Sequence, residues 1–127
     1  MEKGYITTQV VSARGAIPIA QANVFIEKKN GNGMDLVSVQ KTDSSGRTIN
    51  VEVDTPDRIL SESPGNTAPF AVFDIIVTYP SFYTVVIHDV QVFSNEVTLQ
   101  QVEMIPLPEN FQSQNNTFTF DVPPQNL

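Results

Sequence analysis

Short apolar runs alternate with clusters of turn residues along most of the chain. Val, Ile, Thr, Phe and Tyr gather in these runs, and Gly, Pro, Asn, Asp and Ser separate them. This spacing is typical of an all-β sandwich or barrel, and no segment has a convincing helical period. The pattern predicts seven strands, at residues 5–13, 22–29, 34–42, 48–54, 70–79, 82–90 and 97–105.

The connections between the predicted strands include two short turns and one long loop. Residues 30–33 read Asn-Gly-Asn-Gly, the strongest turn signal, because Asn and Gly tolerate the positive φ that a tight hairpin needs. Residues 43–46 (Asp-Ser-Ser-Gly) predict a second hairpin turn. The connection at 55–69 is polar, contains three prolines and is unusually long for a compact domain.

Two of the predicted strands differ in their patterns. In 48–54, Ile49, Val51 and Val53 alternate with polar residues, so we expect these three side chains to be buried together. The apolar run at 70–79 is nearly continuous, which predicts a central strand that is covered on much of both faces.

The C-terminal segment has a different composition from the rest. Residues 110–127 are rich in Asn, Gln and Pro, but Phe118, Phe120 and Val122 alternate with polar residues. This alternation predicts an extra strand at 117–122 with no obvious hairpin partner. The sequence therefore predicts a sandwich at 1–109 and an extended tail at 110–127.

The acidic composition excludes some partners. The chain has 127 residues, enough for one domain, and a net charge of −7. Such a surface repels nucleic acid and anionic membranes, so we expect neither as a partner. There is no Cys, which rules out disulfides and thiol chemistry.

The N-terminus and the hydropathy bear on localisation. The start lacks the basic region and apolar run of a signal peptide, and no apolar stretch is long enough for a membrane helix. We therefore expect synthesis in the cytoplasm and no membrane insertion. A spore or other particle surface would be compatible as the final location.

Three stretches together resemble a known family. They are GYITTQVVSARGAIPIAQANVFI at 4–26, TDSSGRT at 42–48 and YPSFYTVVIHDVQVFSNEVTLQQVEMIPLPE at 79–109. Their order is similar to that of transthyretin-like domains of the carboxypeptidase regulatory-like type, and it covers residues 4–108. Ser81 stands where that family usually has Gly, so the turn there is expected to differ.

The resemblance implies a fold and a broad role. The fold is a seven-stranded Greek-key, Ig-like β-sandwich, and the role is structural, adhesive or scaffolding, without catalytic residues or a cofactor. The ending of the third stretch also resembles small clostridial modules linked to spore cortex or peptidoglycan binding. One enzyme line with transthyretin-like folds, the 5-hydroxyisourate hydrolases, ends in Tyr-Arg-Gly-Ser, whereas this chain ends in Pro-Pro-Gln-Asn-Leu.

The residues themselves also argue against catalysis. His88 is the only histidine, and Asp89 follows it in a predicted strand. Because neighbours in a strand point to opposite faces, Asp89 is poorly placed to orient His88. The chain has no phosphate-binding loop or nucleophile motif. We therefore predict a protein that is not an enzyme.

A group of acidic residues is a candidate calcium site. Glu52 and Asp54 share one face of a predicted strand, and Asp57 opens the long connection. Hard carboxylate oxygens of this kind can bind calcium, although no calcium-loop motif is present. A solvated acidic face explains the same residues.

Two functions remain open. The first is a structural or assembly subunit whose tail pairs as a strand with a neighbouring copy or another protein. Phe118, Phe120 and Val122 would be the inserted anchors.

The second function is a binding module for cell-wall glycan, such as peptidoglycan, or another ligand. Aromatic rings that stack on sugars would be its mechanism. For Tyr79 and Phe82 there is one alternative, that both belong to the core. The candidate residues are Arg58, Asn66, Tyr79, Phe82 and Tyr83.

Overall fold

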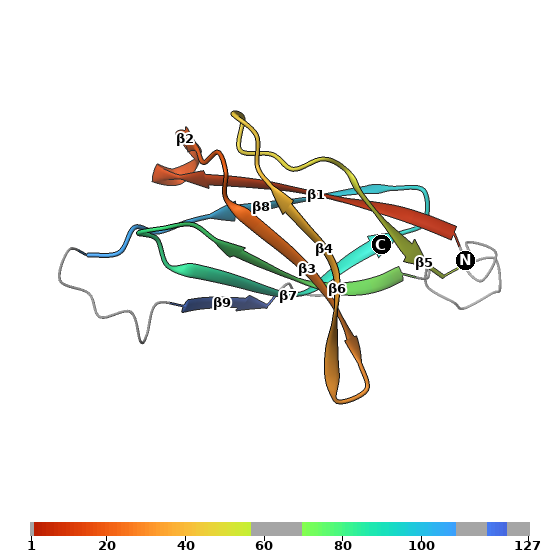
Figure 1. Ribbon diagram of the computed structural model, residues 1–127. Coiled ribbons are helices and arrows are strands. Elements are labelled where there is room, and N and C mark those ends of the chain that lie inside the picture. The colour runs from red at the N-terminus through yellow and green to blue at the C-terminus, as the bar shows by residue number, and fades with distance from the viewer. Residues whose placement is uncertain (1, 57–69, 109–116, 122–127) are drawn as a thin grey trace.

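Two β-sheets pack face to face in the computed structural model (Figure 1), which describes residues 2–56, 70–108 and, for the backbone, 117–121. The described residues contain no α-helix, only a single 3-10 turn at Ala13–Gly15. No helix among them could therefore cross a membrane. The strands are β1 Glu2–Ser12, β2 Ile17–Pro18, β3 Asn23–Asn30, β4 Gly33–Lys41, β5 Val51–Thr55, β6 Phe70–Thr78, β7 Thr84–Phe93, β8 Val97–Glu103 and β9 Thr117–Asp121.

The two sheets differ in size and strand order. In the four-stranded sheet, β8 pairs in parallel with β1, while β5 and β2 pair antiparallel with the two ends of β1. The five-stranded sheet has the order β4-β3-β6-β7-β9. Its first four strands are antiparallel, and β9 is parallel to β7. The protein is thus an all-β sandwich, as the sequence predicts.

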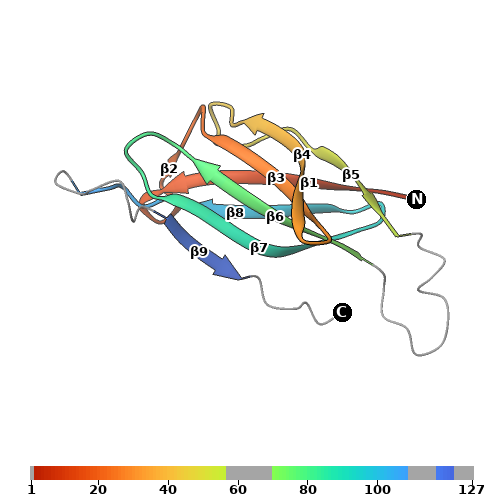
Figure 2. The same ribbon diagram turned by 60° about the horizontal axis from the view of Figure 1, so that its bottom comes forward.

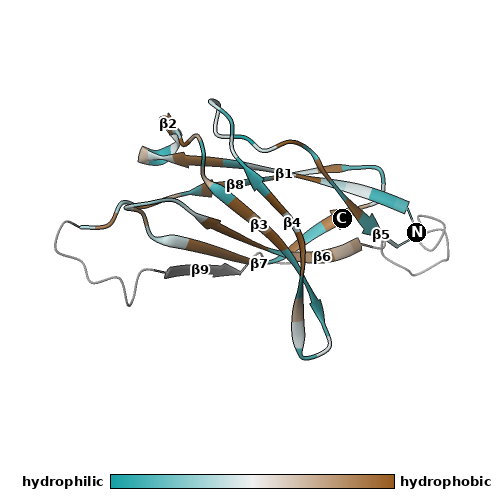
Figure 3. Ribbon diagram, viewed as in Figure 1, coloured by the Kyte–Doolittle hydropathy of each residue, from teal (hydrophilic) through white to brown (hydrophobic). Residues whose placement is uncertain are grey.

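The core lies between the sheets and is built from alternate residues of each strand. Every second side chain of the inner strands turns inward, because successive residues of a strand point to opposite faces. Figure 3 shows the apolar residues gathered in the strands of both sheets, while the tip of the β3–β4 hairpin is hydrophilic. The fully buried apolar residues include Ile6, Val10, Val24, Ile26, Ile75, Val77, Val85, Val90, Val92, Val102 and Met104.

Several sequence predictions are confirmed. All seven predicted strands exist, with ends that shift by a few residues. β6 lies between β3 and β7, as expected for a central strand. The 30–33 turn is a tight hairpin in which Asn30 pairs with Gly33, and Gly31 has a φ of 61°.

Two predictions were wrong. Ile49 does not join the buried face, since its side chain is 66% exposed and the strand begins only at Val51. Residues 43–46 form a turn, in which the Gly46 amide donates to the Asp43 carbonyl at 2.9 Å. It does not close a hairpin, however, because β4 and β5 belong to different sheets.

The β3–β4 hairpin extends beyond the rest of its sheet (Figure 1). Its strands pair with each other out to Asn30 and Gly33, whereas β3 pairs with β6 only as far as Glu27. Four apolar side chains of β4, the outer strand of this sheet, are exposed: Met34, Leu36, Val37 and Val39. A register shift opposite Ile26 and Glu27 leaves Val37 without a partner in β3, which interrupts this open edge.

Candidate functional site

The tail strand lies along one edge of the larger sheet. β9 pairs in parallel with β7, and Figure 2 shows the two strands side by side. The register runs from Thr84 opposite Thr117 to His88 opposite Asp121. The strand predicted at 117–122 therefore exists, and its partner is the chain's own β7.

The assembly candidates occupy defined positions in this register. Phe118 lies opposite Val85 and Phe120 lies opposite Ile87. Val85 and Ile87 are both buried in the core. Val122 lies outside the described residues.

The pairing with β9 ends where β7 contains a β-bulge. Phe73 pairs with Val90 and Ile75 pairs with Ile87, so Asp74 of β6 faces two residues of β7, His88 and Asp89. A bulge of this kind bends the strand and changes its twist. Asp89 takes a φ of 63°, a conformation that Asp tolerates better than most residues.

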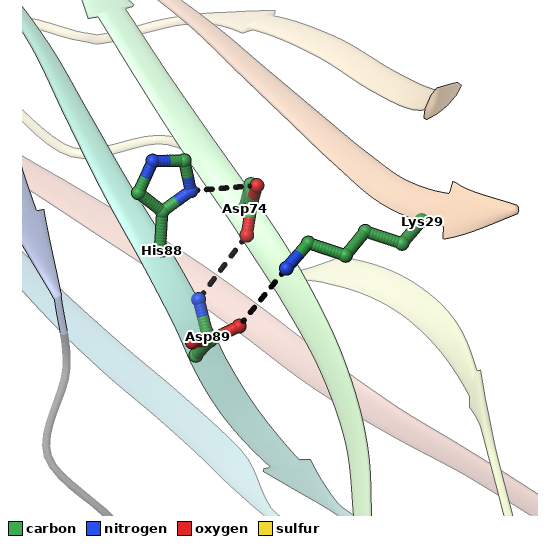
Figure 4. Close-up of polar contacts among 4 residues, drawn as sticks. All are labelled: Lys29, Asp74, His88 and Asp89. Atoms are coloured by element: carbon green, nitrogen blue, oxygen red, sulfur yellow. Dashed lines mark hydrogen bonds and ion pairs between the residues drawn. The ribbon is translucent and has the colours of Figure 1, made fainter. Parts of the chain in front are cut away.

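The carboxylate of Asp74 holds both bulge residues, as Figure 4 shows. His88 Nδ1 is 2.8 Å from Asp74 Oδ2, and the backbone amide of Asp89 donates to Asp74 Oδ1 at 3.1 Å. The Asp74 side chain is 6% exposed, and that of His88 is 34% exposed. Because a carboxylate only accepts hydrogen bonds, Nδ1 is the donor of this pair.

An ion pair connects the bulge to the β3–β4 hairpin. Lys29 Nζ, near the end of β3, lies 3.7 Å from Asp89 Oδ1 (Figure 4). Both side chains are more than half exposed, so solvent screens the attraction and its contribution to stability is small. The pair nonetheless places a positive charge beside the carboxylates of the bulge.

The Asp74–His88 pair has the form of a general-base dyad, but its surroundings do not favour that use. A surface hollow of about 320 Å³ lies nearby, lined by Lys28, Lys29, Asp54, Pro56, Phe70, Ala71, Val72 and Asp74. His88 is not among these residues, so this hollow does not bring a substrate-sized space to the imidazole. The arrangement fits a role in shaping β7.

The calcium candidates lie elsewhere. Glu52 and Asp54 share the exposed face of β5, as predicted, and Asp57 lies outside the described residues. Lys3 of β1 forms an ion pair and a hydrogen bond with Asp54. This hydrogen bond lowers the pKa of Asp54 and raises that of Lys3. Within the described ranges, no three His, Cys, Asp or Glu residues are grouped so that they could hold a metal ion.

The ligand-binding candidates do not form one described surface. Tyr79 and Phe82 pack against the hydrophobic core, and their ring centroids are 5.7 Å apart in an edge-on contact. Tyr83, whose amide donates to the Ile105 carbonyl at 2.9 Å, is half-buried. Arg58 and Asn66 lie outside the described residues. The packing of the two rings favours a structural role for them.

The corner at residues 79–83 contains a residue with a positive φ. The Phe82 amide donates to the Tyr79 carbonyl, and Ser81 between them has a φ of 70°. This is the conformation that favours glycine. The Ser81 backbone therefore has a conformation that is more common for glycine.

Sequence reasoning missed the residue that organises the site. Asp74 lies in the apolar run FAVFDIIVTY, where its charge interrupts an otherwise buried segment. A buried charge nearly always has a partner, so this interruption was the available signal. The partner could not be read from spacing, since the bulge decides which residues of β7 face Asp74.

Comparisons with known proteins give the fold. No protein family and no curated protein matches this sequence, so nothing supports the narrower resemblance to spore-cortex modules. A solved structure of transthyretin from Sparus aurata is 11% identical, with a TM-score of 0.49, and the match covers 81% of this chain and 90% of that chain.

A second solved structure is a minor pilin of Streptococcus agalactiae. It is 15% identical with a TM-score of 0.51, and the match covers 90% of this chain. This chain spans 49% of the pilin's length. At this level of identity the similarity extends to the fold alone. The chain thus shares a β-sandwich fold with part of that pilin.

Proposed function

We propose that this chain is a non-enzymatic structural or assembly subunit that joins neighbouring copies through its tail strand. The observation that carries the proposal is the position of β9. It pairs with the outer edge of β7 and has no strand on its other side among the described residues. Residues 104–107 are still bonded to the sandwich, for example through the Met104 amide and the Val11 carbonyl, and eight residues, 109–116, join Pro108 to β9.

Such a strand can occupy the edge of its own β7 or that of a neighbour. The ladder of main-chain hydrogen bonds is the same in both cases, and so are the core residues that β9 meets. The two forms therefore differ mainly in the geometry of the connection and in protein concentration. Exchange of an identical element between copies forms dimers or longer chains at a small cost in free energy, because the contacts are the same as within one chain.

The remaining features support an assembly role over other classes. The net charge of −7 disfavours nucleic acid as a partner. The same β-sandwich fold occurs in a minor pilin. The surface of a spore or another particle built in the cell would suit such a subunit.

Engineered cysteines test the exchange directly, because the chain has none of its own. Thr84→Cys and Thr117→Cys would be placed in separate chains that carry tags of different mass, since these two positions are opposite in the β7–β9 register. After mixing, unfolding, refolding and mild oxidation, exchange predicts covalent heterodimers on a non-reducing gel. The same two substitutions in one chain report pairing within that chain.

A matched control uses Ser44→Cys in place of Thr84→Cys, since Ser44 lies in an exposed turn that does not pair with β9. Heterodimers with Thr84→Cys but not with Ser44→Cys would support the proposal. If the double variant closes only within its own chain, and the mixtures give no heterodimer above the Ser44→Cys level, tail exchange is wrong.

A further inference from the structure

The outer face of the larger sheet, on the side away from the core, carries a row of apolar residues across four strands. Phe25 of β3 lies opposite both Val39 of β4 and Ile76 of β6, and Ile76 lies opposite Val86 of β7. Directly paired residues of neighbouring strands place their side chains on the same face of a sheet. The residues on either side of this apolar row along β3, β6 and β7 point into the core: Val24, Ile26, Ile75, Val77, Val85 and Ile87.

The apolar row is open to solvent. Val39 is 49% exposed, and the side chains of Phe25, Ile76 and Val86 are half-buried. Leu36 extends the apolar surface along β4, since it lies opposite Glu27 on the same face and is 58% exposed. Contiguous apolar patches on the surface of a soluble protein commonly mark interaction sites.

Charges of opposite sign lie on the two sides of the apolar row. On one side the next pair is Asn23 with Lys41, which gives this border a positive charge. On the other side Glu27 of β3 pairs with Asp74 of β6, and Asp74 bonds to the bulge that contains Asp89. The outer face therefore has a basic border and an acidic border, with the apolar row between them.

Two lysines near the acidic border do not cancel its charge. Lys29 forms an ion pair with Asp89 at 3.7 Å. Lys28 is directed to the other face of β3, where its Nζ lies 5.9 Å from the centre of the Phe73 ring. Among the described residues, neither Glu27 nor Lys41 forms an ion pair, so both can pair with another molecule.

We propose that two copies of this chain pack these outer faces together about a two-fold axis that runs along the apolar row, across the strands. Rotation about this axis brings the two apolar rows into contact, as in the packing of one sheet on another. It also places the basic border of each copy over the acidic border of the other. Lys41 of one copy then lies beside Glu27 of the second copy, and the symmetry repeats this contact.

The charge pattern of the face favours a second copy as the occupant, because the face is complementary to itself. The net charge of −7 on each copy opposes association. Salt at physiological strength screens this repulsion beyond about 8 Å, whereas the contacts between the borders act at short range. This interface uses a face of the sheet and is separate from tail exchange, which uses an edge, so a chain with both could build assemblies longer than dimers.

Sedimentation of the full chain over a range of concentrations, at about 0.15 M salt, tests this interface. We expect a reversible dimer. Val39→Glu should raise the dissociation constant of this dimer roughly ten-fold or more, because it buries a charge without a partner. Val97→Glu is the matched control, since Val97 is 55% exposed on β8 of the smaller sheet, and it should leave the dissociation constant unchanged.

Exchange of the two border charges tests the orientation. Lys41→Glu and Glu27→Lys should each raise the dissociation constant roughly five-fold, as expected for exposed ion pairs. The double variant should return to within about two-fold of the wild type, because each copy then offers the opposite charges at the same two places. Lys41 and Glu27 form no ion pair within one copy, so such a rescue reports a contact between copies.

The same measurement on the oxidised Thr84→Cys/Thr117→Cys variant separates this interface from tail exchange, since the disulfide holds β9 on its own β7. Dimers that persist in this variant are packed through the outer faces, and dimers that disappear were exchanged. The proposal is overturned by that disappearance, by a wild type that stays monomeric up to millimolar concentration, or by a dimer that Val39→Glu leaves intact. Single charge reversals that the double variant does not rescue would overturn it as well.

Discussion

At the scale of single residues, one buried carboxylate determines the shape of the β7 edge. Asp74 uses both of its oxygens, one for the His88 ring and one for the Asp89 amide. These two bonds link the bulge of β7 to the central strand of the sheet. Without them, two polar groups of a partly buried strand would lose their partners.

Asp74→Ala is therefore expected to lower the free energy of unfolding by about 2–3 kcal/mol, since hydrogen-bonding groups left unsatisfied cost this much. Urea denaturation of the variant and the wild type measures the change. Glu96→Gln, at an exposed position, serves as the control and should change stability by less than about 0.5 kcal/mol. An Asp74→Ala variant as stable as the control would contradict this role of the carboxylate.

Ser81 shows a second effect of a single residue, since its φ of 70° is costly for any residue with a Cβ. Ser81→Gly should raise the free energy of unfolding by about 0.5–1 kcal/mol, after allowance for the greater freedom of Gly in the unfolded chain. Thermal unfolding would show this as a higher midpoint. A lower midpoint would mean that the Ser side chain contributes more than the backbone conformation costs.

The residue scale is also where sequence reasoning reached least far. The turn residues Gly31 and Gly46 could be predicted, because local chemistry determines their φ angles. The partner of His88 could not, since Asp74 precedes it by 14 positions and meets it only through the bulge. Contacts of this kind depend on register, which single-residue preferences do not encode.

At the scale of elements, the alternation of apolar and polar residues predicts where the strands are, but tertiary contacts determine where each strand begins and ends. Ile49 continues the apolar pattern of 51–55, yet it lies outside the strand and is exposed. Just before it, Thr48 bonds to Thr8 through its amide and its hydroxyl. These bonds to β1 fix the chain ahead of β5, and alternation alone could not reveal them.

The start of β1 depends on close packing against the end of β7. A Cβ added at Gly4 would lie 2.6 Å from the Phe93 carbonyl oxygen and 2.6 Å from Val92 Cγ1. Gly4→Ala should therefore destabilise the protein by about 1–3 kcal/mol, the usual cost of overpacking.

Gly33→Ala is a suitable control, since its added Cβ would meet nothing closer than 3.8 Å. Guanidinium denaturation of both variants compares the two positions. Equal effects would show that β1 can shift away from β7 at no cost.

At the scale of the whole molecule, the sequence predicted the sandwich but not the order of its strands. Hydrophobic alternation tells which side chains face inward, and it does not tell which strands are neighbours. Both parallel pairs, β1 with β8 and β7 with β9, were unforeseen for this reason. β9 covers the edge of its own β7, and the proposed exchange would place it on the β7 of another copy instead.

The length of the connection before β9 should control that choice. Eight residues, 109–116, join Pro108 to Thr117, and a connection that is too short prevents a strand from reaching its own sheet. Deletion of residues 110–114 should therefore shift the chain from monomers toward dimers that exchange β9, as measured by light scattering after size-exclusion chromatography. Deletion of residues 123–127, which follow β9, removes the same number of residues and should leave the mass unchanged. If the shortened chain instead stays monomeric while its 117–121 amides lose the NOE values of a paired strand, β9 has left its own β7 without pairing with the β7 of another copy. In that outcome the tail is not donated between copies.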